Sequence, residues 1–189
     1  MLAVCAAAAA PHYLKAREAA RRQEAHVRML ASKPLVLDAD TKAILDSADR
    51  VETFRLQGSD EDEDAFGHSA AAYAAPQYLE DHLVICRRPT QGRAFAGALQ
   101  AALVQGTSEP DAAQCFEPGL GFRAWQGKAH TDICVCFTCQ GVEIVTKDAK
   151  QAVLHQSLTE LGASRPALLA LSKQAFPQDK ALAALPTQL

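Results

Sequence analysis

Residues 121–145 read GFRAWQGKAHTDICVCFTCQGVEIV, and their pattern is the most informative one in the chain about its fold. Three β-rich segments (GFRAW, TDICVCF and VEIV) alternate with short turns that contain glycine. Consecutive strands joined by such turns form an antiparallel meander. Side chains alternate between the two faces of a strand, and in the middle segment both faces are apolar: Ile133, Val135 and Phe137 on one, Cys134 and Cys136 on the other. The middle segment is therefore expected in the interior of a sheet.

Flanking segments supply further strands and helices. Apolar runs predict strands at 50–56 and 83–87, the second ended by Pro89. Helical periodicity and capping residues predict helices at 40–46, 93–104, 148–161 and 164–176. The order of these elements predicts an α+β fold, an antiparallel sheet with a C-terminal meander and helices packed on one face.

A turn near Gly127 fixes the expected register of the first hairpin. In that register Phe122 lies opposite Thr131, and residues before Phe122 lie opposite residues beyond Thr131. Cys115 is then expected at the same end of the sheet as Cys136 and Cys139.

The N-terminal residues 1–33 differ in composition from the rest of the chain. An apolar stub at 1–14 precedes a basic helix at 15–32, which is typical of a stem or anchor remnant beside a membrane and also of a solvated helix. Residues 34–189 are expected to form a single α+β domain in which the acidic segment 57–76 is a mobile loop. The chain contains no run of about 20 apolar residues, which excludes a complete transmembrane helix.

Length and charge narrow the function classes. The 189 residues, 49% of them hydrophobic, suffice for one domain that folds without a metal or a disulfide. The formal net charge of -3 argues against a general nucleic-acid binder, which normally carries a basic excess.

Four of the six cysteines lie within 25 residues, at 115, 134, 136 and 139. Cys86 lies in an apolar strand and is expected to be a core residue. Cys136 and Cys139 form a C-x-x-C at a hairpin turn, followed by a β-branched segment. A thioredoxin-type C-x-x-C opens a helix instead, so a thioredoxin-like site is disfavoured.

Three alternatives remain for Cys115, Cys136 and Cys139. A disulfide from Cys115 to Cys136 or Cys139 would close a loop of some 20 residues and stabilise the domain by roughly 3 kcal/mol, in an oxidising compartment. A zinc site would use the paired thiolates of the turn, with Cys134 or His130 completing the ligand set. Unpaired core thiols are the third alternative.

The segments CFEP (115–118), GFRAW (121–125) and DICVCFTC (132–139) resemble a pattern in a group of uncharacterised bacterial proteins, many of them exported or lipoprotein-like. The resemblance covers residues 115–145, and C-F-x-P with C-F-x-C is its specific part. At Cys134 an aliphatic residue would be expected, so Cys134 is left out of the proposed site. The resemblance supports the fold and implies export, but it implies no activity.

Two function classes follow. The first is a non-enzymatic exported or membrane-tethered module, located in the cell envelope or outside the cell, that binds another protein. The second is a thiol-redox or zinc-dependent protein centred on Cys115, Cys136 and Cys139. Asp81 and His82 beside a strand suggest an acid–base pair, but no nucleophile motif accompanies them. The first class is therefore favoured, with no catalytic residues, no resident cofactor and no nucleic-acid partner expected.

Overall fold

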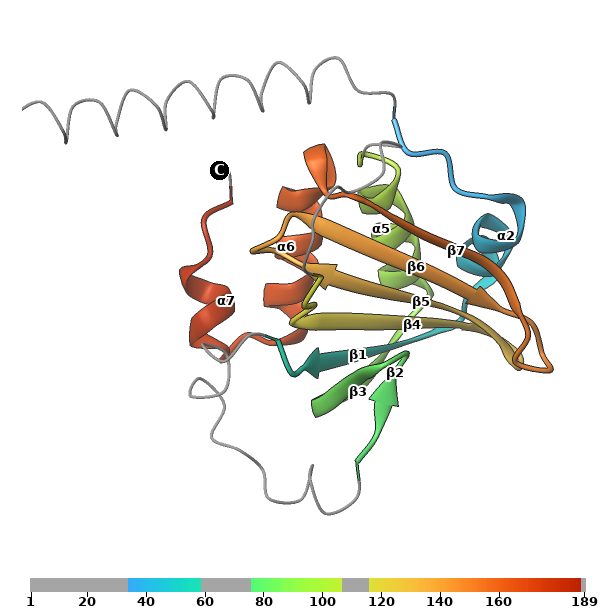
Figure 1. Ribbon diagram of the computed structural model, residues 1–189, viewed down its shortest axis with the longest axis horizontal. Coiled ribbons are helices and arrows are strands. Elements are labelled where there is room, and N and C mark those ends of the chain that lie inside the picture. Colours follow the sequence, from blue (N-terminus) through green and yellow to red (C-terminus); the bar gives the residue numbers. More distant parts are fainter. Residues whose placement is uncertain (1–33, 59–75, 107–115, 188–189) are drawn as a thin grey trace, which may run out of the picture. The chain divides into compact units, whose positions relative to one another are not determined.

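The computed structural model describes residues 34–58, 76–106 and 116–187 (Figure 1). The predictions for residues 1–33, for most of the acidic segment 57–76 and for Cys115 lie outside these residues. Among the described residues, no helix is both long enough and apolar enough to cross a membrane.

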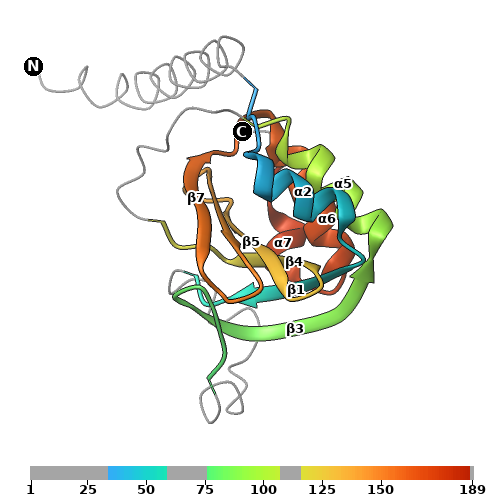
Figure 2. The ribbon, with the colours of Figure 1, turned by 90° about the vertical axis from the view of Figure 1, so that its right-hand side faces the viewer.

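The predicted α+β class is confirmed by the order of elements. The chain runs α2 (Ala39–Ser47), β1 (Arg50–Leu56), β2 (Tyr78–Leu79), β3 (His82–Gly92), α5 (Arg93–Leu103), β4 (Leu120–Gln126), β5 (Ala129–Cys136), β6 (Gly141–Lys147), β7 (Val153–Glu160), a 3-10 turn (Gly162–Ser164), α6 (Arg165–Ala175) and α7 (Lys180–Ala184). The strands form one antiparallel sheet in the order β2-β3-β1-β4-β5-β6-β7. The sheet is curled, and α2, α5 and α6 lie on one side of it (Figure 2).

The predicted meander is confirmed as β4, β5 and β6, but the predicted register of its first hairpin is wrong. Phe122 lies opposite Ile133, and Thr131 lies opposite Ala124. The turn contains only Gly127 and Lys128, since Gln126 already pairs with Ala129. Gly127 has a φ of 61°, a backbone conformation that glycine adopts without steric cost and that tight hairpin turns require.

The helix predicted at 148–161 is wrong, because this segment forms the strand β7, paired with β6 along its length. The Asp148 carboxylate accepts hydrogen bonds from the backbone N–H groups of Lys150 and Ala152, at 2.8 and 2.9 Å, and Gln151 has a φ of 69°. These contacts make a tight turn that returns the chain to β6. The helix-favouring alanine, lysine and glutamine residues at 149–152 are thus part of the turn, and the residues that follow them pair with β6 as a strand.

Strand β3 continues through Pro89 to Gly92, so the prediction that Pro89 ends it is wrong. Pro89 lies where the pairing with β1 shifts register, between the pairs Val51–Gln91 and Thr53–Arg88. Among the described residues, β2 pairs only with His82 and Leu83, at the start of β3. Pro89 lies beyond the part of β3 that pairs with β2, and it lies at the bulge in the pairing with β1. Its missing N–H group therefore interrupts no regular series of hydrogen bonds between strands.

Helices packed on one face of the sheet enclose the main core, as the sequence predicts. The α5 stripe of Phe95, Leu99 and Leu103 is buried against the inward side chains of β4, β5 and β6. Helix α6 begins after Ser164, carries Pro166 in its first turn and ends at Ala175, before Pro177. The predicted helices at 93–104 and 164–176 are confirmed to within one or two residues.

The opposite face of the sheet carries a smaller apolar cluster. The side chain of Leu79 in β2 lies so close to Gly121 in β4 that a Cβ at Gly121 would overlap it. Beside this contact lie the other members of the cluster, Phe54, Leu56, Val84 and Cys134. The short β2–β3 hairpin therefore folds over this face, which we call the open face, and brings the residues of its turn onto β5 and β6.

Candidate functional site

The Cys136–Cys139 pair lies at the turn between β5 and β6. The two cysteines are joined by a disulfide, with their Cα atoms 5.4 Å apart. Cys136 is the last residue of β5, and β6 begins at Gly141, so the C-x-x-C is part of a hairpin turn, as predicted. Gln140 completes the turn with a φ of 60°. A strand, and not a helix, follows the pair, which is unlike the thioredoxin arrangement.

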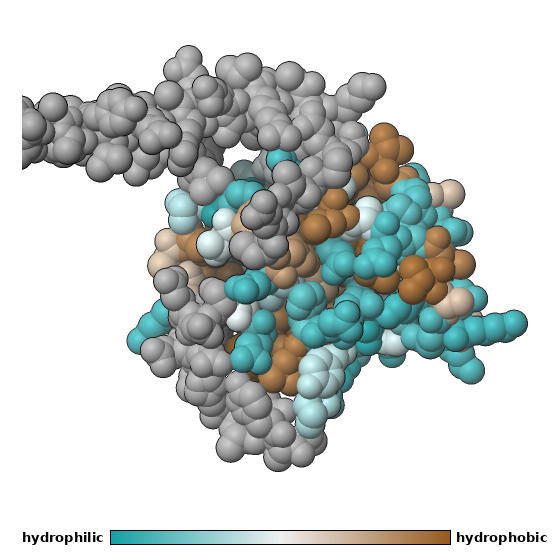
Figure 3. All heavy atoms as spheres, viewed as in Figure 1, coloured by the Kyte–Doolittle hydropathy of each residue, from teal (hydrophilic) through white to brown (hydrophobic). Residues whose placement is uncertain are grey.

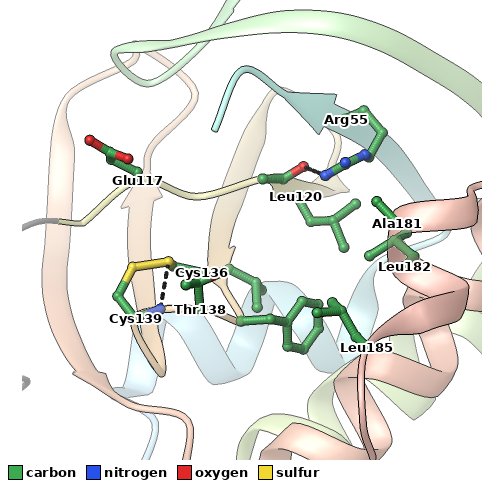
Figure 4. A pocket seen from close by; sticks show the side chains of 12 residues that line it. Arg55, Glu117, Leu120, Cys136, Thr138, Cys139, Ala181, Leu182 and Leu185 are labelled. Atoms are coloured by element: carbon green, nitrogen blue, oxygen red, sulfur yellow. Dashed lines mark hydrogen bonds between the residues drawn. A yellow bond between two sulfur atoms is a disulfide. The ribbon is translucent and has the colours of Figure 1, made fainter. Parts of the chain in front are cut away.

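The two sulfur atoms differ in environment. Cys136 is 3% exposed, whereas Cys139 is only partly buried and follows the exposed Thr138. The backbone N–H of Cys139 donates a hydrogen bond to Sγ of Cys136, at 3.1 Å (Figure 4). An attacking thiol therefore reaches the sulfur of Cys139 more easily, and the sulfur of Cys136 is the one that has a hydrogen-bond donor to stabilise negative charge.

A pocket of about 240 Å³ adjoins this disulfide. Most of its lining is apolar and comes from β4, β5 and the C-terminal segment, including Leu120, Leu182 and Leu185. The charged side chains of Arg55 and Glu117 also line it, and Figure 4 shows Glu117 on the side of the disulfide and Arg55 on the side of α7. The pocket thus combines an apolar wall, two opposite charges and a disulfide.

A buried ion pair holds α7 against this pocket. Nε of Arg55 lies 2.9 Å from Oδ2 of Asp179, and the two side chains are 2% and 0% exposed. Asp179 also accepts a hydrogen bond from the backbone N–H of Leu182, at 3.0 Å, and so caps α7. The Arg55 guanidinium donates a further hydrogen bond to the carbonyl of Gly119 (Figure 4). Arg55 therefore connects β1, the approach to β4 and α7.

Arg165 ties the cysteine turn to the end of the chain. Its guanidinium donates hydrogen bonds to the carbonyls of Phe137, at 2.7 Å, and Pro186, at 3.2 Å. The same group lies over the Phe137 ring, 5.4 Å from its centroid. Arg165 thereby holds the turn against the C-terminal segment.

The open face carries a second group of polar residues. Arg123 donates two hydrogen bonds to the Asp132 carboxylate, both of 2.6 Å, and Lys147 donates two to Glu80, of 2.7 and 2.8 Å. Burial alone would raise the pKa of Asp132, but the hydrogen bonds from Arg123 and the nearby His130 hold it well below its usual range. Burial raises the pKa of Glu80, and the neighbouring Asp132 adds to that rise.

Two sets of metal-ligating residue types meet on the open face. One is His82, Cys134 and Glu143, and the other is Glu80, His130 and Asp132; within each set the ligand atoms lie within 4.8 Å of one another. The zinc site predicted on Cys136 and Cys139 with Cys134 or His130 does not form in this oxidised state, since both cysteines of the turn are bonded to each other. For the same reason neither cysteine of the turn is free for the predicted disulfide with Cys115, and Cys115 itself lies outside the described residues.

Sequence reasoning identified the cysteine turn but missed its surroundings. Cys86 packs beside the main core, in keeping with its predicted role, although it is only partly buried. Arg55 and Asp179 carried no sequence signal, because each is a lone charge in its own segment. The open face did carry a sequence signal, since the alternation of side chains along β5 places four reactive residues on one side of the strand: His130, Asp132, Cys134 and Cys136.

Comparison of the chain with protein-family models, with curated proteins and with solved structures finds no match. The site is therefore interpreted from its own geometry.

Proposed function

We propose that the protein takes part in thiol–disulfide exchange at Cys136 and Cys139, with a thiol-bearing partner protein that docks in the adjoining pocket. The observation that carries this proposal is the contrast between the two sulfur atoms, one accessible and one buried with a hydrogen-bond donor, beside an apolar pocket. A purely structural staple needs neither feature.

The exchange follows from this contrast. A thiolate of the partner attacks Sγ of Cys139, the Cys136–Cys139 bond breaks, and a mixed disulfide forms between the partner and Cys139. Cys136 leaves as a thiolate that accepts the hydrogen bond from the Cys139 N–H. A second partner thiolate then attacks the partner's own sulfur in the mixed disulfide, which releases an oxidised, disulfide-bonded partner and leaves both cysteines reduced.

The pocket supports a preference for a protein partner. A small thiol such as glutathione is mostly polar, whereas the lining offers Leu120, Leu182 and Leu185. An apolar side chain next to the partner's cysteine would bury its surface there, and each fully buried large side chain is worth about 1.5–3 kcal/mol. A segment with an apolar residue beside its cysteine is therefore the expected substrate.

Variants of the full-length protein that each lack one cysteine of the pair test the exchange. Cys136→Ser keeps the accessible thiol of the pair and is expected to form a mixed disulfide with an apolar peptide whose cysteine is activated as a disulfide with thionitrobenzoate, which leaves as the free thiolate, because access controls thiol reactivity. Cys139→Ser keeps only the buried thiol of the pair, and position 136 is expected to react at least about tenfold more slowly for the same reason. Mass spectrometry of the adducts over time measures both rates.

Cys86→Ser, at the partly buried cysteine beside the core, is the matched control and should leave the wild-type rate of reduction unchanged. Equal rates at positions 139 and 136 in the two variants would contradict the proposed roles. A native pair that stays oxidised under a large excess of dithiothreitol would contradict exchange altogether.

A second candidate function is the exported or membrane-tethered protein-binding module, and the edge of the sheet favours it. Strand β7 is the last strand of the sheet among the described residues, and its Val153 and Leu154 are 55% and 49% exposed. Figure 3 shows apolar side chains on the side of the molecule where β7 lies. An edge strand with apolar side chains can accept a strand from a partner protein. The disulfide fits export, because disulfides persist in oxidising compartments.

Site-specific photo-crosslinking in cells tests this second function. A photoreactive residue in place of Leu154 is expected to crosslink to a partner protein, whereas one at Gln174, exposed on α6, is not. The physical reason is that strand addition brings a partner within contact distance of the β7 edge alone. Crosslinks of equal yield at both positions would count against a β7 partner.

A further inference from the structure

We propose that His82, Cys134 and Glu143 form a binding site for a zinc ion on the open face, with the fourth coordination position left free. The three donors come from different strands: His82 begins β3, and Cys134 in β5 and Glu143 in β6 are directly opposite each other. Their ligand atoms lie within 4.8 Å of one another. Donors around a tetrahedral zinc ion lie about 3.5 Å apart, so small side-chain rotations close the set.

The donor chemistry selects zinc. An imidazole nitrogen, a thiolate and a carboxylate are ligands that zinc accepts together, whereas calcium and magnesium prefer oxygen ligands alone. One thiolate and one carboxylate also neutralise the two positive charges of the ion. Three protein ligands and a free position are the arrangement of zinc sites that bind water or a substrate.

The protonation states of two donors suit this role. Burial lowers the pKa of His82, which keeps the imidazole neutral and free to ligate near neutral pH. Burial, together with the charges of Asp132 and Glu143, raises the pKa of the Cys134 thiol, so the apoprotein holds a proton there. A cysteine ligand of zinc is a thiolate, so zinc binding displaces that proton.

The surroundings orient the donors, and in the part of the chain that the structure describes no lysine or arginine is paired with them. Gln156 donates a hydrogen bond to Glu143, at 2.9 Å, and the ring of His82 lies edge-on against Phe116, with centroids 6.1 Å apart. Arg123 is a positive charge that acts to lower the pKa of Cys134, and Asp132 already binds it through two hydrogen bonds. Glu143 thus keeps its charge available for an ion.

The neighbouring set of Glu80, His130 and Asp132 differs in this respect. Its two carboxylates are bound by Lys147 and Arg123, so a metal would have to displace both cations. The second set is therefore part of an ion-pair network, whereas the carboxylate of the first set, Glu143, pairs with no cation among the described residues. We therefore assign the zinc ion to the set that contains Cys134.

Metal titration of the full-length protein tests the site, in a background of Cys136→Ser and Cys139→Ser that removes the thiols of the exchange site. One equivalent of zinc is expected to bind, with release of a proton. Cobalt in its place is expected to show the charge-transfer absorption of a thiolate ligand. His82→Gln and Cys134→Ala are each expected to weaken zinc binding by at least about 100-fold, since even outer partners of a ligand contribute 10–100-fold.

Cys86→Ser is the matched control for thiol loss and should retain the affinity and the cobalt spectrum. Gln156→Ala removes only the partner of Glu143 and should weaken binding by about tenfold. Absence of stoichiometric binding, or undiminished binding in His82→Gln and Cys134→Ala, would overturn the proposal. Because the background lacks Cys136 and Cys139, neither result bears on the thiol-exchange function.

Discussion

Replacing Asp132 with alanine is expected to lower the free energy of unfolding by about 3–5 kcal/mol, because it leaves the Arg123 guanidinium partly buried without its counter-ion. Asp132 is 0% exposed and binds Arg123 through two hydrogen bonds of 2.6 Å. It also lies 3.5 Å from Nε2 of the buried His130. Urea denaturation of the wild type and the variant at pH 7 measures the difference.

The same carboxylate predicts how stability depends on pH. Its pKa is lowered in the folded protein, so its contribution is fully present above the usual carboxyl value of about 3.9 and is lost as the pH falls below it. Glu80 acts in the opposite direction, because its raised pKa makes the folded state bind a proton more readily than the unfolded state. The wild type is therefore expected to lose stability below about pH 4 more steeply than the Asp132→Ala variant.

Two further variants separate charge from packing. A double replacement, Arg123→Met with Asp132→Leu, is expected to recover most of the lost stability, since an apolar pair of similar volume removes both buried charges. Asp46→Ala, which breaks the exposed pair between Lys42 and Asp46, should leave the free energy of unfolding nearly unchanged. If Asp132→Ala unfolded at the same urea concentration as the wild type, the ion pair would have no role in stability.

Asp179→Ala is expected to destabilise the protein by a similar amount, about 3–5 kcal/mol, on the other side of the sheet. Arg55 would remain 2% exposed without the carboxylate 2.9 Å away, and α7 would lose its cap at the N–H of Leu182. Because Leu182 and Leu185 line the pocket, the variant should also expose the disulfide to small thiols. Denaturation and the rate of reduction of Cys136–Cys139 measure the two effects.

Asp179→Asn distinguishes the cap from the charge. Asparagine caps helices about as well as aspartate, so this variant should keep α7 in place yet lose the ion pair. We expect most of the stability loss to remain, with a rate of disulfide reduction close to that of the wild type. A reduction rate that rises equally in both variants would show that the charge of Asp179, and not the cap on α7, protects the disulfide.

Local patterns in the sequence were sufficient for much of the fold. The glycine at 127 and the β-rich runs on either side of it determine a hairpin, because a two-residue turn and alternating side chains act over a few residues. Helix α6 could also be predicted from the sequence, since Pro166 favours a helix start and Pro177 cannot continue a helix. Strand β7 could not be predicted in this way, because helix-favouring residues at 149–152 precede it and its conformation depends on pairing with β6.

The candidate site likewise has a part that follows from local sequence and a part that depends on contacts between distant segments. The local sequence was enough to place Cys136 and Cys139 in one hairpin turn, because they are three residues apart and strands lie on either side of them. The bond between these two cysteines, the pairing of Arg55 with Asp179 and the approach of His82 to Cys134 depend on how distant segments pack. Contacts between distant segments depend on strand order and on the curl of the sheet, which arise from packing of the whole core and from no single stretch of residues.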